Sequence, residues 1–297
     1  MSGVRGASHL EALRGMPFTK MSGSGNDFVI FDGRVVPRAL VEDPEVIRAI
    51  CNRHNGIGAD GLVVLEPEAA VATGTGSGSV RLRYFNSDGS PADLCGNATL
   101  CSTALAVHLG LASASGMTLL TGAGPVASRL PEPAKARPEI SLRPVADLRE
   151  AVPIEAGPGE ERIGFALAGV PHVVVLCADA DAIDLDGRGR SIRWHPALGS
   201  AGANVNWVSP RAEGGWRYRT FERGVEGETL ACGTGAVATA ALLIRWGAPA
   251  DTVVLLRTSS GRDLDVRFLA DPADPTQPVP VLAGEGRIVF TGHVVTL

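Results

Sequence analysis

The sequence predicts an α/β protein, α+β in its arrangement, made from two copies of one unit. Twice a glycine-rich turn leads from a cysteine into a helix of small and apolar residues, first at Cys95 and again 137 positions later at Cys232. The same spacing relates residues along both helices and in a strand beyond each, without a gap over about forty residues. Short alternating segments typical of strands precede both cysteines. An internal duplication accounts for all three observations.

The first copy opens with two strands joined by a tight glycine turn. This pattern occupies residues 18–31 and places Asn26 beside the turn. Residues 62–65 are predicted as a buried strand, and residues 80–85 alternate as a half-exposed strand that leads to Asn86. We therefore expect Asn26 and Asn86 at the ends of strands, where polar side chains can bind a ligand or only close their own turns.

The second copy repeats this plan. Residues 165–176 contain a glycine turn followed by an apolar strand, with His172 at the start of that strand. Residues 201–208 contribute Asn204 and Asn206, and residues 217–223 lead to Glu222 and Arg223. Outside this setting, Glu222 and Arg223 would be explained as an ordinary surface ion pair.

Domain boundaries follow from changes in composition. Residues 125–161 are rich in proline, glycine and charge and predict a linker region. The last strand, 287–295, is expected to return to the first unit, because a duplicated barrel needs both edges covered. We expect a mobile N-terminal extension and two halves, bounded as follows: extension 1–15; first half 16–143, completed by 286–297; second half 144–285.

Composition excludes several classes of function. The formal net charge of −5 provides no basic stripe for nucleic acid, and no apolar run is long enough to span a membrane. The first fifteen residues lack a signal peptide's apolar segment, and five cysteines are an odd number, so reduced thiols in a cytoplasmic protein are expected. Neither a dinucleotide, phosphate-loop nor C-x-x-C motif occurs, and no histidine stands at zinc-ligand spacing from the cysteines. We expect neither cofactor nor metal.

Two thiols at helix starts indicate acid–base chemistry. The first turn of a helix stabilises anions, which is expected to lower the pKa of a thiol there. Two such groups facing one carbon could remove a proton from one side and supply one from the other. For either cysteine alone, a small buried core residue is the commoner explanation.

Six blocks, in order, resemble the diaminopimelate epimerase family over most of residues 16–297: SGSGNDFVIFD, NRHNGIGADGL, YFNSDGSPADLCGN, GVPHVVV, GANVNWV and RTFERGVEGETLACGTGA. The resemblance implies two similar domains, each a mixed or antiparallel sheet barrel wrapped around a central helix. It also implies pyridoxal-independent conversion of LL-2,6-diaminopimelate to the meso form, in lysine and cell-wall synthesis, by a homodimer.

The resemblance also implies residue roles. Cys95 and Cys232 match the catalytic pair, with Cys95 acting on the LL face, and His172 and Glu222 match residues that set the thiols' proton state. The residues matching groups that bind the substrate are Asn26, Asn86, Gly96, Asn97, Asn204, Glu222, Arg223, Gly233 and Thr234.

Four positions depart from the commonest family pattern: Gly61, Ala98, Leu100 and Val170. These departures put fine substrate specificity in question and leave a racemase or epimerase of the same fold, acting on another amino acid, as the alternative. Two other classes stay open, a thiol-disulfide protein and an amino-acid-binding module. Buried structural thiols are expected at Cys51, Cys101 and Cys177.

Overall fold

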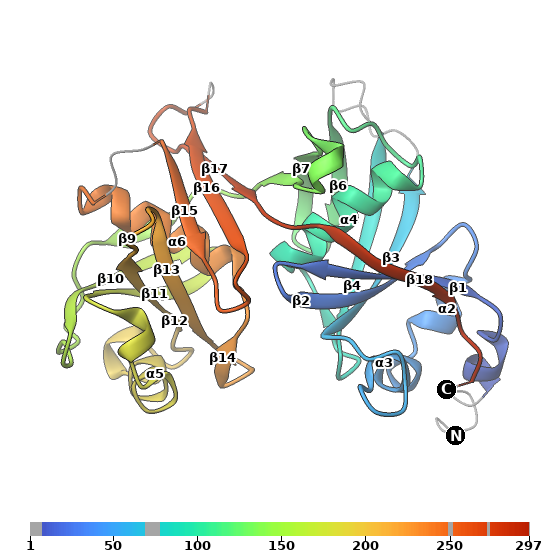
Figure 1. Ribbon diagram of the computed structural model, residues 1–297, viewed down its shortest axis with the longest axis horizontal. Helices are drawn as coiled ribbons and strands as arrows, with labels where there is room; N and C mark the ends of the chain where they lie inside the picture. The colour runs from blue at the N-terminus through green and yellow to red at the C-terminus, as the bar shows by residue number, and fades with distance from the viewer. Residues whose placement is uncertain (1–7, 69–77, 249–251, 272–273, 297) are drawn as a thin grey trace. The chain divides into compact units, whose positions relative to one another are not determined.

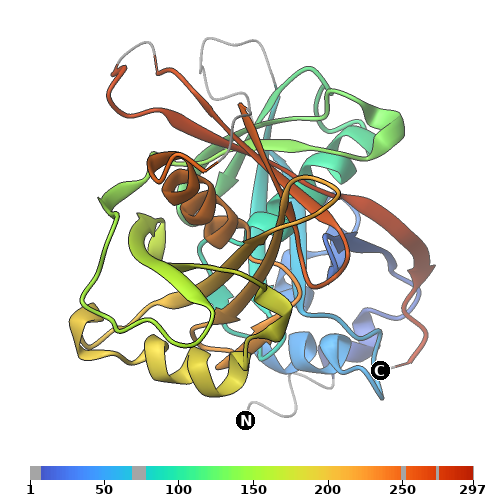
Figure 2. The ribbon, with the colours of Figure 1, turned by 60° about the vertical axis from the view of Figure 1, so that its left-hand side comes forward.

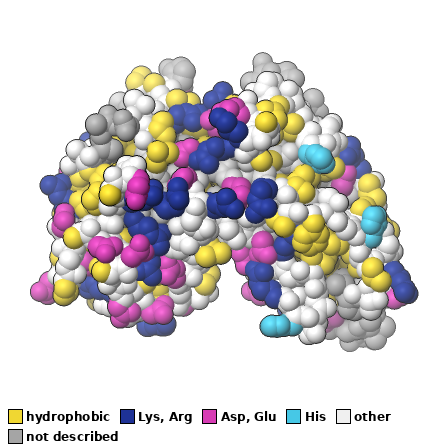
Figure 3. Space-filling view, viewed as in Figure 1, with side chains coloured by type: hydrophobic (Ala, Val, Ile, Leu, Met, Phe, Trp, Pro, Cys, Tyr) yellow, Lys and Arg dark blue, Asp and Glu magenta, His cyan; other side chains and the backbone are white. Residues whose placement is uncertain are grey.

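The computed structural model describes residues 8–68, 78–248, 252–271 and 274–296, which form two compact units. Unit 1 comprises residues 1–140 and 285–297, and unit 2 comprises residues 141–284. Both are mixed α/β structures, as the sequence predicts (Figure 1). None of the helices formed by the described residues has the length and apolar character that a membrane span needs. On the face drawn in Figure 3, basic and acidic side chains lie interspersed.

The strands of unit 1 form a mixed sheet in which β2–β3 and β4–β6 are parallel and the other neighbours antiparallel. Its elements are β1 (Pro17–Gly23), β2 (Asn26–Asp32), α2 (Arg38–Val41), α3 (Pro44–Cys51), β3 (Gly61–Glu68), β4 (Ser79–Asn86), β5 (Pro91–Ala92), α4 (Gly96–His108), β6 (Met117–Thr121), β7 (Gly124–Arg129), η1 (Pro133–Lys135), β8 (Glu139–Ser141) and β18 (Arg287–His293).

Unit 2 repeats the order and the pairing, with β11–β12 and β13–β15 as its parallel neighbours. Its elements are β9 (Ala146–Arg149), β10 (Glu160–Ala168), β11 (Val170–Cys177), η2 (Ala180–Ala182), α5 (Leu185–Arg193), η3 (Pro196–Leu198), β12 (Asn204–Pro210), β13 (Trp216–Glu222), β14 (Gly227–Thr229), α6 (Gly233–Arg245), β15 (Val253–Arg257), β16 (Asp263–Leu269) and β17 (Val279–Ala283).

The two topologies differ in the origin of one strand. In unit 2, β9 pairs antiparallel with β10, whereas in unit 1 the equivalent place beside β1 is taken by β18 from the end of the chain. The first unit's sheet therefore includes a strand that arrives after the whole second unit. This topology is the return that the sequence predicts for residues 287–295.

Each unit is organised around a helix that is buried on nearly all sides. In α4, 11 of 13 residues are buried, and in α6, 10 of 13. A helix without a polar face is stable only inside a protein, and α4 contacts β1, β3, β4, β6 and β18, while α6 contacts β10, β11, β12, β16 and β17 (Figure 2). Small residues on these helices allow the strands to approach closely. The predicted arrangement of a sheet wrapped around a central helix is confirmed.

The outer face of each sheet carries a second apolar layer. In unit 1, Val46, Ile47 and Ile50 of α3 pack with side chains of β2 and β3. In unit 2, α5 lies over β12 and β13, where Trp207 and Phe221 are fully buried. Each sheet is thus buried on both faces, with its inner face lined by the residues that surround the helix starts.

Two predictions at the borders were wrong. Residues 8–12 are helical rather than mobile, because Leu13 is fully buried in the unit 1 core and His9 contacts Asp43 at 3.1 Å. Residues 1–7 of the predicted extension lie outside the described residues. The predicted linker 125–161 contains the boundary between the units at 140/141, but it also contains β7, which pairs with β6 and β8, and β9, which pairs with β10.

Candidate active site

The two cysteines occupy the same position in the two units. Cys95 is the N-cap of α4 and Cys232 the N-cap of α6, both with extended backbone angles. The two helices begin and end 137 residues apart, so the predicted register holds through their full length. Each helix therefore points unpaired backbone N–H groups toward the region of its cysteine, as an anion site requires.

In unit 1 a polar network fixes the strand ends beside α4. The Asn97 amide donates to Asn26 Oδ1 at 2.8 Å, and Asn26 Nδ2 donates to Asp60 Oδ2 at 3.0 Å. Arg53 joins Asp60 and Asp27 at 2.7 and 2.6 Å. The structure thus brings Asn26 and Asn97 together, and it places behind them a group of charges that the sequence did not suggest.

Lys20 contacts this group from the face of the sheet that α3 covers, since it pairs with Val29 of the α3 cluster. Its ammonium lies 2.8 Å from Asp27 and its side chain is only 8% exposed. Burial alone would raise the pKa of Asp27, but hydrogen bonds and charges from Arg53 and Lys20 hold it below its usual value. The one sequence signal for this role is a lysine two residues after Phe18, on the same face of the first strand.

Cys95 itself has aromatic neighbours. It is half-buried, and Tyr84, which is buried with a raised pKa, interacts with it. Tyr84 packs edge-on against Phe28 at 6.0 Å. A Cβ atom on Gly61 would lie 2.5 Å from the Tyr84 ring, so Tyr84 explains why glycine occupies this departure from the family pattern.

Asn86 lies at the end of β4 and closes its own turn. Its side chain donates to Ser90 Oγ at 3.1 Å, and its backbone N–H donates to the Ser90 carbonyl at 2.9 Å. The structure therefore assigns Asn86 a turn-forming contact, and a substrate contact is an additional role that it leaves to be tested.

In unit 2 the helix start is surrounded by polar groups. His172, fully buried, lies 3.1 Å from the Thr234 hydroxyl through Nε2 and 3.3 Å from Asn206 through Nδ1. Thr234 Oγ1 in turn lies 3.6 Å from Cys232 Sγ. Burial lowers the pKa of His172 from 6.5 to about 3, with a smaller contribution from Arg223, so His172 is neutral at pH 7.

The expected low pKa of a helix-start thiol is wrong for Cys232. Burial raises its pKa well above the usual value, and the Glu222 carboxylate raises it further. Hydrogen bonds from Thr234 and from the Gly235 backbone act in the opposite direction but are outweighed. Desolvation therefore dominates over the helix dipole, and Cys232 is a thiol at neutral pH.

Glu222, Asn204 and Arg223 lie at the adjoining strand ends. Glu222 accepts a hydrogen bond from Thr229 Oγ1 at 2.5 Å and interacts with Cys232. Asn204 Oδ1 accepts the Arg223 backbone N–H at 2.8 Å, which fixes the backbone where β13 ends. The five predicted residues Glu222, Arg223, Asn204, Cys232 and Thr234 thus belong to one cluster with His172.

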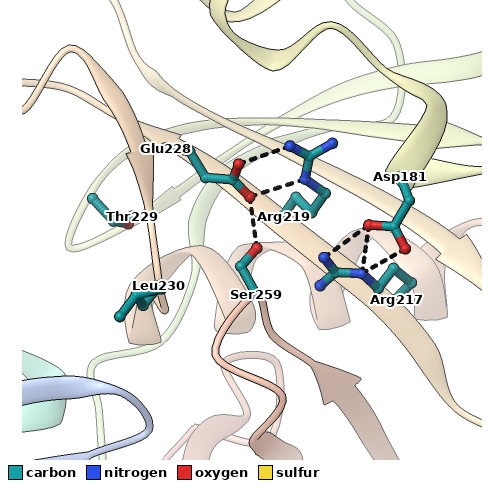
Figure 4. Close-up of a pocket in the computed structure, with 7 residues that line it drawn as sticks. All are labelled: Asp181, Arg217, Arg219, Glu228, Thr229, Leu230 and Ser259. Atoms are coloured by element: carbon teal, nitrogen blue, oxygen red, sulfur yellow. Dashed lines mark hydrogen bonds and ion pairs between the residues drawn. The ribbon is translucent and has the colours of Figure 1, made fainter.

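A surface cavity of about 430 Å³ lies on the other face of β13 (Figure 4). Arg217 and Arg219 line it, and strand alternation places these side chains opposite Tyr218, Thr220 and Glu222. Asp181 and Glu228 pair with the two arginines at 2.8 and 2.7 Å. Because the charges that line this cavity are paired with one another, we take the cluster around Cys232, and not this cavity, as the candidate active site.

The remaining cysteines are buried, as expected. Burial raises the pKa of Cys51 and Cys177 to about 12 and that of Cys101 well above its usual value. Such thiols stay protonated and inert.

Sequence reasoning missed several site residues: Lys20, Arg53, Tyr84, Tyr218 and Thr220. The single hydroxyl hydrogen of Tyr218 is shared between Asn206 Oδ1 and the Cys232 carbonyl, both 3.0 Å from the hydroxyl oxygen. Alternation along β13 could have indicated that Tyr218 and Thr220 face the same side as Glu222.

Comparisons with known proteins match this geometry. The family model "Diaminopimelate epimerase" matches residues 18–138 and 165–270. The diaminopimelate epimerase of Gemmatimonas aurantiaca is 57% identical over 287 residues, covering 95% of this chain and 100% of the relative. That of Aquifex aeolicus is 36% identical, covering 86% and 91%. A hydroxyproline epimerase structure from Agrobacterium vitis aligns with a TM-score of 0.65 at 18% identity, covering 95% and 92%.

The duplicated unit, with a cysteine at the start of each central helix, defines a class of two-domain α/β proteins. Its fold is shared with the hydroxyproline epimerase. The family match and the 57% identity place the sequence more narrowly. The chain belongs to the diaminopimelate epimerase family.

Proposed function

We propose that this protein interconverts LL-2,6-diaminopimelate and meso-diaminopimelate with two thiols and without a cofactor. The observation that carries the proposal is the pair of cysteines at equivalent helix starts in a member of this family. The identity of 57% to a diaminopimelate epimerase over the full length of that relative favours this substrate over another amino acid.

In the proposed reaction, Cys95 removes the α-hydrogen from the LL isomer and Cys232 delivers a proton to the opposite face. The raised pKa of Cys232 supports its part, since it carries a proton at neutral pH. The reverse reaction exchanges the roles, with Cys232 as the base. The proposal requires that both sulfur atoms reach one carbon from opposite sides.

The helix starts are proposed to hold the reacting carboxylate. Gly96 and Asn97 of α4, and Gly233 and Thr234 of α6, belong to first turns whose N–H groups stabilise an anion. As the α-proton leaves, charge moves into this carboxylate, so the same contacts strengthen in the transition state.

The distal end of the substrate is proposed to meet the strand ends. Arg223 offers a planar guanidinium to the second carboxylate, and Glu222 offers an acceptor to its ammonium group. Asn26, Asn86 and Asn204 complete the set. The networks behind Asn26 and Asn204 support this role, because they hold both side chains in place before substrate binds.

Proton exchange tests the proposal. The purified protein, without added cofactor, is incubated with LL-diaminopimelate in deuterated water. We expect α-deuterium in the meso product. Cys95→Ser and Cys232→Ser should each reduce turnover more than about a hundredfold, whereas Cys51→Ser, at a buried thiol, should keep it. Exchange with other amino acids but not with diaminopimelate would favour the alternative epimerase.

The same variants separate the other classes. A thiol-disulfide protein would gain activity on oxidation, whereas the proposed enzyme should lose it when an oxidant joins Cys95 and Cys232 and recover it with reductant. A binding module would bind diaminopimelate equally well with Cys232→Ser and release no exchanged product. The proposed chemistry needs reduced thiols, which supports a cytoplasmic location.

We further propose a homodimer formed through β18. Among the described residues, β1 is the strand that pairs with β18, whose Val289 and Phe290 are 45% and 47% exposed. A second copy could pair its β18 against this edge about a two-fold axis. Phe290→Asp should shift the sedimenting species to monomer, whereas Leu269→Asp, at an equally exposed strand residue of unit 2, should not. A monomeric wild type would contradict the proposal.

A further inference from the structure

The Asn206 side chain is the centre of a fully buried hydrogen-bond network. Its Nδ2 donates to the Val173 carbonyl at 2.9 Å and lies 3.3 Å from His172 Nδ1. Its Oδ1 accepts from the hydroxyls of Tyr218 and Thr220, both at 3.0 Å. A carbonyl oxygen can only accept, so the contact with Val173 fixes which end of the amide carries the N–H groups.

This orientation determines the tautomer of His172. Asn206 Nδ2 is a donor, so Nδ1 of the neutral imidazole must accept, and the ring proton must lie on Nε2. Nε2 then donates to Thr234 Oγ1, at 3.1 Å. With one lone pair of its oxygen occupied, the Thr234 hydroxyl can turn its own hydrogen toward Cys232 Sγ, 3.6 Å away.

We propose that Asn206 is a positioning residue that holds His172 as the Nε2–H tautomer, so that Thr234 donates its hydrogen bond to the sulfur of Cys232. The tautomer of His172 follows from the hydrogen-bond geometry around a buried, neutral ring, and only its catalytic consequence rests on the proposed function. Once Cys232 has given its proton to the substrate, its thiolate is left beside the Glu222 carboxylate, and the directed hydroxyl offsets part of that repulsion.

Packing shows that this network constrains the backbone around it. A Cβ atom on Gly235, in the first turn of α6, would lie 2.3 Å from both Asn206 Oδ1 and the Tyr218 hydroxyl. Glycine is therefore required for the helix start to approach the amide so closely. The titratable groups facing Cys232 come from β11 and β13, namely His172, Tyr218 and Glu222.

The first test is the tautomer in the wild type. Nitrogen-15 NMR of the protein labelled at histidine distinguishes the protonated ring nitrogen from the bare one, and His172 is assigned by comparison with His172→Gln. We expect a bare Nδ1 and a protonated Nε2 at pH 7. A proton on Nδ1 would overturn the proposal, whether or not the protein epimerises diaminopimelate.

The second test reverses the tautomer. Asn206→Asp offers Nδ1 only acceptors, so the ring proton should move to Nδ1 and Thr234 should donate to the ring instead of the sulfur. We expect kcat to fall about tenfold with KM changed less than twofold, the effect of one lost hydrogen bond in the transition state. Ser209→Ala removes a different buried hydrogen bond from β12 and should leave both tautomer and kcat as in the wild type.

Rescue separates positioning from simple stability. Thr234→Ser keeps a hydroxyl and should retain kcat within about threefold, whereas Thr234→Val should lose as much as Asn206→Asp. Equal losses of kcat in Thr234→Ser and Thr234→Val would contradict the proposed direction of the hydrogen bonds from His172 through Thr234 to Cys232. A wild type without epimerase activity but with the Nε2–H tautomer would refute the proposed function and keep the structural inference.

Discussion

The burial of neutral His172 predicts a specific loss of stability in mild acid. Its pKa is about 3 in the folded protein against 6.5 in an unfolded chain. Between these pH values the histidine is protonated in the unfolded chain but not in the native state. The free energy of unfolding therefore falls as the pH falls from 6.5 toward 3. At pH 5.0 the linkage relation gives about 2 kcal/mol less stability than at pH 7.0.

This magnitude is insensitive to the exact folded value. Any folded pKa below about 4 gives nearly the same difference at pH 5.0, because the native histidine is then unprotonated there. Asp27 and Glu160 also have lowered pKa values in the folded protein. Their contributions to the free energy of unfolding are lost mainly below pH 3.8 and 4.5, the ordinary pKa values of these carboxyl groups. The window from pH 7.0 to 5.0 therefore isolates the histidine.

Urea unfolding followed by tryptophan fluorescence is a suitable assay, since all four tryptophans (Trp194, Trp207, Trp216 and Trp246) lie in unit 2 with His172. The wild type should lose about 2 kcal/mol more than His172→Gln between pH 7.0 and 5.0. His195→Gln, at a partly exposed histidine of the same unit, should behave like the wild type. Equal losses in the wild type and His172→Gln would refute the reasoning.

Three further predictions follow from close contacts. Gly235→Ala should lower the free energy of unfolding by about 2–3 kcal/mol in urea titrations, because its Cβ overlaps the Asn206 amide, while Gly227→Ala, with open space around it, should cost under about 1 kcal/mol. Lys20→Met should lower the free energy of unfolding by about 3 kcal/mol and raise KM, because Asp27, which lies behind Asn26, loses its buried partner. Arg34→Met is the control, since the ion pair of Arg34 with Asp32 is more exposed and should contribute little. Equal losses of stability in the two variants, measured by circular dichroism, would contradict the prediction. Deleting residues 287–297 should abolish amide-exchange protection only at the β1 amides that bond to β18, because the amides that bond to β2 keep their partner. The fluorescence transition of unit 2 should stay within about 1 kcal/mol of the wild type, and protection of the β18-facing amides would show that β18 is dispensable.

The sequence was informative where chemistry is local. Glycine and alanine around Cys95 and Cys232 restrict those segments to tight turns and closely packed helices, and both helices begin directly after the cysteines, as predicted. It was less informative where the fold combines distant segments. The pKa of Cys232 depends on burial that only the folded sheet creates. Strand β7 was missed because GPVASR is short and carries a glycine and a proline, although it pairs with β6 and β8 in the sheet.

The network around His172 illustrates the same limit. His172, Asn206, Thr220 and Thr234 come from four separate elements, and each residue alone has a bland explanation. The sequence indicated both Asn204 and Asn206, but only Asn204 matched a substrate contact of the family; Asn206, facing the same side, makes more of the contacts. Tertiary register, rather than any local motif, brings these groups together.

Duplication gave both halves the same backbone but not the same surroundings for the two sulfur atoms. The strand registers equate Phe28 with His172, Val63 with Asn206 and Tyr84 with Thr220. One thiol therefore lies beside an aromatic and aliphatic set, and the other beside a hydrogen-bonded relay. An inversion at carbon needs one sulfur to begin with a proton and the other without, a condition that two identical environments would not favour. Under the proposed mechanism, divergence at these three positions supplies the required inequality, while the helix starts, which are proposed to hold the carboxylate, remain alike.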